Sequence, residues 1–192
     1  MKRIVSLITA CILLLCLCAC SSEPSLVGTV PTGNNTSTEA PNTNVQSTEA
    51  PSTEAPTVGD KVFQLGDSVE LDGVVVSFLD IIESNGEQFF EPADGNIFVL
   101  CEFEITNNSE TELTVSSMLS FEAYCDDYSC EYSLSALMAK GDHTQLDGSI
   151  AAGKKMKGVI GYEIPSDWKQ LEVQYTPDIL DNDKIIFVAT NN

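Results

Sequence analysis

NIFVLCEFEIT, residues 96–106, carries the pattern that decides the fold. Every second residue of this stretch is apolar: Ile97, Val99, Cys101, Phe103 and Ile105. Glu102 and Glu104 lie between them and face the other way, because successive side chains of a strand point to opposite faces. The stretch therefore predicts a β-strand with one face in a core and the other toward solvent.

Further short apolar runs, separated by Gly, Asp, Asn and Pro, predict strands on both sides of this stretch. They cover residues 62–65, 69–71, 74–82, 113–124, 130–137, 156–164, 170–175 and 184–189. The run 74–82 is apolar on both faces, as in a covered strand, and residues 135–142 allow one helical turn at most. Asp72-Gly73 and Asp147-Gly148 are turn signals. Many short strands with regular turns favour a β-sandwich, so residues 60–192 are predicted to form one all-β domain.

Three segments of this domain resemble the DUF4352 and DUF5067 group of bacterial lipoproteins. They are NIFVLCEFEITNNSE (96–110), FEAYCDDYSCEY (121–132) and AAGKKMKGVIGYEIPSDWKQLEVQY (151–175). The resemblance covers about residues 62–176 and rests on turns and core positions. It implies an immunoglobulin-like β-sandwich, related to secreted mycobacterial antigens of that shape, and it transfers no catalytic residue. The chain departs from the group at Ala152, where proline usually precedes the Gly-Lys turn, and in the cysteines around its hairpin.

Residues 1–19 have the organisation of a secretory signal peptide. Lys2 and Arg3 precede an apolar run that is shorter than the ~20 residues of a transmembrane helix. Leu17-Cys18-Ala19-Cys20 resembles the bacterial lipobox, in which the last cysteine becomes a diacylglycerol-cysteine with fatty acyl chains such as palmitate. We therefore expect Cys20 to anchor the protein in the lipid bilayer at the extracellular face of the cell membrane.

Two alternatives for the N-terminal segment fit less well. One is an uncleaved membrane anchor. The other is a metal site built from the four clustered cysteines, which are Cys11, Cys16, Cys18 and Cys20. A metal site needs ligands held on a folded scaffold, whereas these cysteines lie in a short apolar run and the chain has one histidine.

Residues 20–59 have the composition of a linker. The unit Ser-Thr-Glu-Ala-Pro occurs three times, ending at Pro41, Pro51 and Pro56. Segments rich in Ser, Thr, Glu and Pro bury too little apolar surface to offset the entropy of ordering the backbone. We expect a disordered tether between Cys20 and the folded domain, with an upper reach of about 120 Å.

The chain carries a formal net charge of -20 at pH 7. Such a charge repels phosphate backbones, which excludes nucleic acid as a partner, and it also repels anionic lipid headgroups. Positively charged partners and divalent cations are the natural candidates, and the alternative is that the charge serves solubility alone. Loop acids are candidate calcium ligands if they gather at one end of the sandwich; they are Asp126, Asp127, Asp178, Asp181 and Asp183.

Cys125 and Cys130 bracket Asp-Asp-Tyr-Ser, which suggests a four-residue hairpin loop. Residues that bracket such a loop can lie opposite each other, where a disulfide could form outside the cytoplasm. The alternative is two free thiols. Cys101 is expected to stay unpaired and to point inward as a small apolar residue.

No set of residues in the sequence marks an active site. His143, the single histidine, lies in a polar loop, and there is no phosphate-binding, dinucleotide-binding or Cys- and His-rich metal motif. Trp168 is expected in the core rather than as an exposed anchor. We therefore predict a non-catalytic binding or interaction module for an unknown protein or cell-wall partner, with no cofactor except a candidate calcium ion. The alternatives are a calcium-dependent binding module and, less well supported, an envelope hydrolase with two carboxylates.

Overall fold

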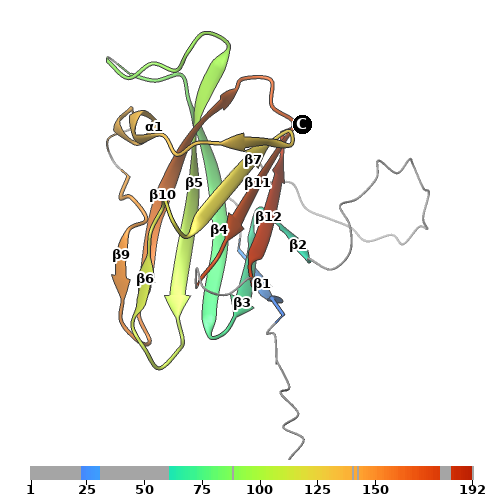
Figure 1. The fold of residues 1–192 in the computed structure, drawn as a ribbon, viewed down its shortest axis with the longest axis vertical. Coiled ribbons are helices and arrows are strands. Elements are labelled where there is room, and N and C mark those ends of the chain that lie inside the picture. Colours follow the sequence, from blue (N-terminus) through green and yellow to red (C-terminus); the bar gives the residue numbers. More distant parts are fainter. Residues whose placement is uncertain are drawn as a thin grey trace, which may run out of the picture.

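The computed structural model describes residues 23–30, 61–87, 89–139, 141, 143–177 and 183–191. These residues form two five-stranded sheets that pack face to face (Figure 1). The first sheet has the order β1 (Ser25–Thr29), β3 (Asp67–Leu71), β4 (Val74–Ser84), β5 (Asn96–Asn107) and β10 (Lys155–Pro165). The second has the order β2 (Val62–Gln64), β12 (Ile185–Thr190), β11 (Gln170–Tyr175), β7 (Phe121–Cys125) and β8 (Tyr128–Cys130).

Two smaller elements complete the described fold. Strands β6 (Leu113–Val115) and β9 (Gly148–Ile150) pair with each other, and α1 (Leu134–Met138) is a single short helix. The predicted immunoglobulin-like β-sandwich is confirmed. Among the residues described, no helix is long and apolar enough to cross a membrane.

Strand β5 is the long central strand of the first sheet, as residues 96–106 predicted. It pairs with β4 on one side and with β10 on the other along almost its whole length. The predicted inward residues are buried, and so is Phe98 on the opposite face. Phe98 is covered because it packs against Ala136 and Ala139 at helix α1.

Aromatic rings join the two sheets. Phe103 of β5 stacks on Phe78 of β4 with ring centroids 4.5 Å apart. From the other sheet, Phe121 of β7 and Phe187 of β12 reach Phe103 at 5.3 Å and 6.0 Å. Since these rings are buried, they form the centre of one core shared by both sheets.

A bulge in β4 explains why residues 74–82 are apolar on both faces. The register with β5 shifts between Phe78 and Asp80, which moves the next core-facing side chain from an even to an odd position. Beyond the bulge Ile81 packs against the core, and Glu83 accepts a 2.9 Å hydrogen bond from the indole Nε1 of Trp168. Trp168 is buried, as expected.

The two Asp-Gly turn signals had different outcomes. Asp72 and Gly73 form the predicted two-residue turn between β3 and β4, both with positive φ. Asp147-Gly148 instead leads into β9. There the Asp147 carboxylate accepts hydrogen bonds from the backbone N–H and the hydroxyl of Ser117.

Two predicted strands were wrong in part. The single strand expected over 113–124 is divided into β6 and β7, because residues 116–120 form a turn in which Ser120 N–H bonds to Ser116 C=O at 2.8 Å. The strand expected over 130–137 ends at Cys130 and is followed by α1. Ser133 caps that helix by accepting a hydrogen bond from Ala136 N–H at 3.2 Å, so the predicted single helical turn is confirmed.

Part of the predicted linker is a strand. Residues 25–29, expected to be disordered, form β1 and pair antiparallel with β3. Leu26 and Val27 favour an extended chain, and without β1 the backbone groups of β3 would form an open sheet edge. Beyond the strand, Val30 N–H bonds to Gly66 C=O at 2.6 Å. The signal peptide, Cys20 and the Ser-Thr-Glu-Ala-Pro units lie outside the described residues.

We predict that Phe103→Ala lowers the free energy of unfolding by about 3–5 kcal/mol, because it removes a buried ring that contacts three others. Urea denaturation followed by fluorescence of the single tryptophan measures the change. Phe89→Ala is the matched control, since that ring is 92% exposed and its loss should change the stability by less than ~0.5 kcal/mol. Equal losses for the two variants would contradict the assignment of the core.

Candidate functional site

The sandwich has one flank where the edge strands of both sheets lie on the same side. Strand β8 ends the second sheet and β10 ends the first. Residues 131–147, here called the crossover, leave β8, pass along β10 and contain α1 (Figure 1). The crossover pairs with β10 at two points, Tyr132 with Tyr162 and Gln145 with Val159. We call this side of the molecule the open flank.

Glycines on β10 allow the crossover to approach the strand closely. Ser133 N–H donates to Gly161 C=O at 2.7 Å, and Val159 N–H donates to Thr144 C=O at 2.8 Å. A Cβ atom on Gly161 would lie 2.8 Å from the Ser133 oxygen, and one on Gly158 would lie 2.7 Å from the Thr144 oxygen. Any side chain there would push the crossover away, so both glycines are needed for the shape of the flank.

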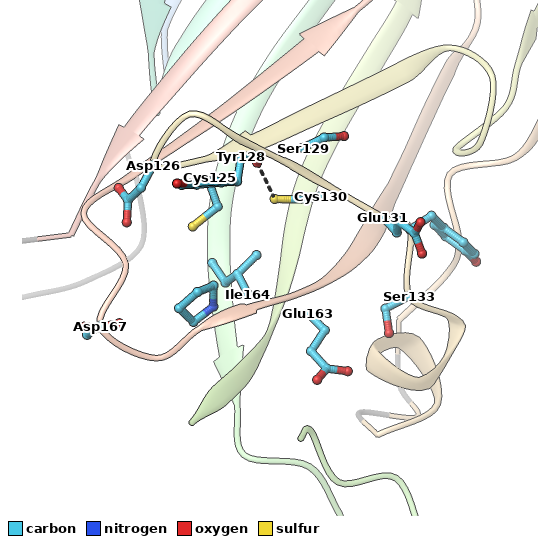
Figure 2. A pocket seen from close by; sticks show the side chains of 12 residues that line it. Cys125, Asp126, Tyr128, Ser129, Cys130, Glu131, Ser133, Glu163, Ile164 and Asp167 are labelled. Atoms are coloured by element: carbon cyan, nitrogen blue, oxygen red, sulfur yellow. Dashed lines mark hydrogen bonds between the residues drawn. The ribbon is translucent and has the colours of Figure 1, made fainter. Parts of the chain in front are cut away.

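A groove of about 540 Å³ lies between β8 and the end of β10. Its lining residues are Cys125, Asp126, Tyr128, Ser129, Cys130, Glu131, Tyr132, Ser133, Glu163, Ile164, Pro165 and Asp167. Figure 2 shows the side chains of Cys125, Cys130 and Ile164 in the space between the β7–β8 hairpin and the strand below it. Tyr128 stands at the rim and is 80% exposed. We call this hollow the β8–β10 groove.

The groove is acidic. Asp126, Glu131, Glu163 and Asp167 line it, and none of its described lining residues is Lys or Arg. The carboxylate of Asp126 accepts hydrogen bonds from the backbone N–H groups of Lys169 and Gln170. Glu163 Oε1 accepts from Ala93 N–H and from Asn96 Nδ2, both at 2.9 Å. Two of the four negative charges are therefore fixed in place by the β10–β11 and β4–β5 loops.

The cysteines at the groove are poor nucleophiles. Burial raises the pKa of Cys125 to about 11, with further contributions from Asp126 and Asp167. Burial also raises the pKa of Cys130 to about 12, and the neighbouring Cys125 adds to the shift. Cys101, which is fully buried, has a raised pKa for the same reason. Since the thiolate is the reactive form of cysteine, these thiols remain protonated and unreactive at neutral pH.

The β7–β8 hairpin does not have the predicted four-residue loop. Its turn consists of Asp126 and Asp127 alone, both with positive φ, rather than of four residues. Cys125 therefore pairs with Tyr128, and Cys130 pairs with Ala123. The two cysteines share one face but are diagonal neighbours, whose Cα atoms are typically ~7–8 Å apart, beyond the ~4.4–6.8 Å of most disulfides. Both are free thiols in the structure.

A second hollow of about 440 Å³ lies on the other side of residues 129–132. Its lining residues are Ser117, Met118, Phe121, Glu122, Ala123, Tyr124, Ser129, Cys130, Glu131, Tyr132 and Tyr162. Phe121, Ala123 and Tyr162 are buried and form its floor, while Met118, Glu122, Ser129 and Glu131 are exposed around its rim. We call it the tyrosine hollow. Sequence reasoning did not identify it, because the crossover that pairs Tyr132 with Tyr162 was predicted as a strand.

The predicted calcium ligands are not brought to one end of the sandwich. Asp126 bonds to Gln170, the first residue of β11. Asp183 lies just before Ile185, which pairs with Tyr175 at the other end of β11. The length of that strand, about 17 Å, separates the two positions. A single site that includes both is therefore excluded, and Asp178 and Asp181 lie outside the described residues.

Other candidate groups stand alone. His143 lies in the crossover and lines neither hollow. Within the ranges that the structure describes, no three His, Cys, Asp or Glu residues are arranged to hold a metal ion.

Comparison with known proteins places the chain in a family. The model of a domain of unknown function, DUF4352, matches residues 63–185. The chain belongs to the DUF4352 family. The matched range includes both sheets except β1 and most of β12, and it contains both hollows of the open flank. Among the curated proteins none matches this chain.

Solved structures are similar to this DUF4352 domain. The structure of ycdA of Bacillus subtilis, a candidate lipoprotein, has a TM-score of 0.53 at 18% identity, over 62% of this chain and 37% of that one. The yjhA protein of Bacillus subtilis has a TM-score of 0.50 at 17% identity, over 68% of this chain and 99% of that one. An uncharacterised β-sandwich protein of Clostridium difficile 630 has a TM-score of 0.46 at 17% identity, over 72% and 100%. The aligned region thus spans little more than a third of the ycdA structure.

We expect iodoacetamide to alkylate Cys125 and Cys130 at pH 7 at least ~100-fold more slowly than in the urea-unfolded chain, whose thiols have a pKa near 8.5. The raised pKa values reduce the thiolate fraction, so the rate should still be increasing with pH at pH 10. Peptide mass spectrometry measures the rates, and a two-proton mass deficit would reveal a disulfide. Rapid labelling of the folded chain at pH 7 would contradict the assignment.

We also predict that calcium and magnesium, at equal ionic strength, raise the midpoint of thermal unfolding equally. Both ions screen the negative charge of the chain, whereas the described acidic positions do not converge on one site. Differential scanning calorimetry of the full chain in detergent, with chelator as the reference, measures the midpoints. A rise of several degrees with calcium alone would show a specific site.

Proposed function

We propose that this DUF4352 protein is a non-catalytic binding module, held at the outer face of the cell membrane by a lipidated Cys20, whose open flank binds positively charged polypeptide segments. The observation that carries the proposal is the β8–β10 groove, an acidic hollow between two strand edges. A cationic segment complements its charge, and the net charge of the chain attracts the same partners over longer distances.

The backbone of β8 supports recognition of an extended segment. In a hairpin with a two-residue turn, Cys125 and Tyr128 exchange the hydrogen bonds closest to the turn, so Ser129 N–H and C=O point away from β7. Within the described ranges, neither group bonds to backbone elsewhere. Free edge groups of this kind pair with an added strand, which provides affinity, while adjacent side-chain pockets provide specificity.

The chemistry of the groove supports binding rather than catalysis. Its thiols are protonated at neutral pH because their pKa values are raised. A hydrolase with two carboxylates needs acids that face the substrate with free oxygens. Asp126 is already bonded to backbone N–H groups through both oxygens, and Glu163 is bonded to residues 93 and 96 through Oε1. These bonds hold Asp126 and Glu163 in place, which supports a role of the two acids in shaping and charging the groove.

The proposed location depends on the N-terminal segment. The lipobox-like Leu17-Cys18-Ala19-Cys20 follows a charged start and a short apolar run. Two or more acyl chains on Cys20 would hold the protein stably in the bilayer.

A charge reversal at the groove tests this function. We expect a fluorescein-labelled nonapeptide of alternating lysine and threonine to bind the full chain in detergent, with an affinity that falls as salt rises. Glu131→Lys should weaken binding roughly tenfold, because Glu131 lines both hollows. Fluorescence anisotropy measures the dissociation constant.

Glu110→Lys is the matched control for charge, because Glu110 is also exposed but lies at the opposite end of β5. Ser129→Pro tests whether the partner segment pairs with β8 as an added strand, because it removes an outward N–H group without breaking the pairing with β7. Equal effects of the two lysine variants would show attraction by net charge alone. Equal binding of a glutamate-threonine peptide would contradict the proposed function.

A further inference from the structure

The tyrosine hollow contains two hydroxyl groups without partners. Tyr162 is only 2% exposed, and neither its hydroxyl nor that of Tyr132 has a hydrogen-bond partner in the part of the chain that the structure describes. Their backbones pair directly across the crossover and β10, so both side chains lie on the same face. A buried polar group without a partner is costly and calls for an explanation in a bound molecule.

Polar groups approach the Tyr132 hydroxyl but are engaged with one another. Burial raises the pKa of Tyr132, and Asp147 raises it further, while hydrogen bonding toward the side chains of Ser117 and Gln145 lowers it. Ser117 is already engaged, because its hydroxyl donates to Asp147 Oδ2 at 2.7 Å and accepts from Gln145 Nε2 at 3.0 Å. No hydrogen bond of normal geometry joins this network to the Tyr132 hydroxyl.

The polar groups around the hollow suit a cation. Glu122 and Glu131 add two carboxylates at the rim, and no Lys or Arg is found among the described residues that line it. Carboxylates only accept hydrogen bonds, and a tyrosine oxygen can accept one. Tyr124 also lines the hollow, and aromatic rings attract cations. A ligand that donates several hydrogen bonds and carries positive charge would satisfy all of these groups.

We propose that the tyrosine hollow binds an arginine side chain of the partner polypeptide. A guanidinium group has five N–H donors in a planar fork, is always charged and stacks on aromatic rings, whereas the ammonium group of lysine has three donors and is strongly hydrated. This inference rests on the proposed function. A segment in the β8–β10 groove reaches the tyrosine hollow because Ser129, Cys130, Glu131 and Tyr132 line both.

The probe for this inference is N-acetyl-arginine methylamide, with its citrulline counterpart as a neutral control of nearly the same shape. Calorimetric titration of the full chain in detergent measures both affinities. The arginine probe should bind at least about tenfold more tightly than the citrulline probe. Tyr162→Phe and Tyr132→Phe should each weaken arginine binding roughly five- to tenfold, because each removes one hydrogen bond to a charged group.

Tyr175→Phe is the matched control variant. Its hydroxyl is also buried and without a partner among the described residues, but it lines neither hollow, so arginine binding should not change. In the unsubstituted protein, carbon-13 resonances of Tyr132 and Tyr162 should shift as the arginine probe is added, while those of Tyr175 remain fixed. This second measurement needs no variant and stands if a substitution disturbs folding.

Three outcomes would overturn the inference. Equal affinity for the arginine and citrulline probes would show that charge is not recognised in the hollow. Arginine binding that is lost in Glu131→Lys but unchanged in Tyr162→Phe and Tyr132→Phe would place the cation at the rim, with water satisfying the hydroxyls. Binding of the lysine-threonine peptide without binding of the arginine probe would end this inference and leave the proposed function intact. The reverse result, binding of the arginine probe without binding of that peptide, would end the proposed function.

Discussion

The packing of Phe103 against rings from both sheets is the interaction on which the structure depends. Phe78 and Phe103 are stacked within one sheet, and Phe121 and Phe187 reach them from the other. This contact sets the distance between the sheets at the centre of the sandwich. At one flank the edge strands β8 and β10 of the two sheets are neighbours, and the crossover pairs with β10 there. Residues 129–132 line both hollows of this flank.

Local patterns predicted the elements that depend on local chemistry. The alternation of apolar and polar residues identified β5. Asp72-Gly73 identified a hairpin because Asp and Gly are favoured at turn positions with positive φ. The bulge in β4 was not predictable from the sequence. A run that is apolar on both faces fits a strand covered on both sides, and it fits equally a strand in which a bulge changes which residues face the core. Strand β1 was missed because its pairing partner, β3, is about 40 positions later in the sequence and the surrounding composition is that of a linker.

The candidate site was predicted less completely, and for a related reason. The sequence places Cys125, Cys130 and the acids near one another along the chain, but the register decides which of them meet. A two-residue turn made the cysteines diagonal neighbours, and the length of β11 separated Asp126 from Asp183. Tyr132 and Tyr162 are brought together by a crossover that no periodic pattern marks. Close approach required Gly158 and Gly161, which in the sequence resemble ordinary interruptions of a strand.

Strand β1 determines how the domain is oriented relative to the N-terminal segment. Four residues lie between Cys20 and Ser25, so the covalent distance between the two is at most about 18 Å. Ser25 pairs with Glu70, beside the turn between β3 and β4, whereas the β8–β10 groove lies beside Pro165, roughly 30 Å away along the sheet. Any surface to which Cys20 is fixed therefore faces the end of the sandwich that carries Asp72 and Gly73, and the groove points away from that surface. In this arrangement the chain between Cys20 and β1 sets the distance of the domain from that surface, because the Ser-Thr-Glu-Ala-Pro units come after β1 and before β2 in the sequence.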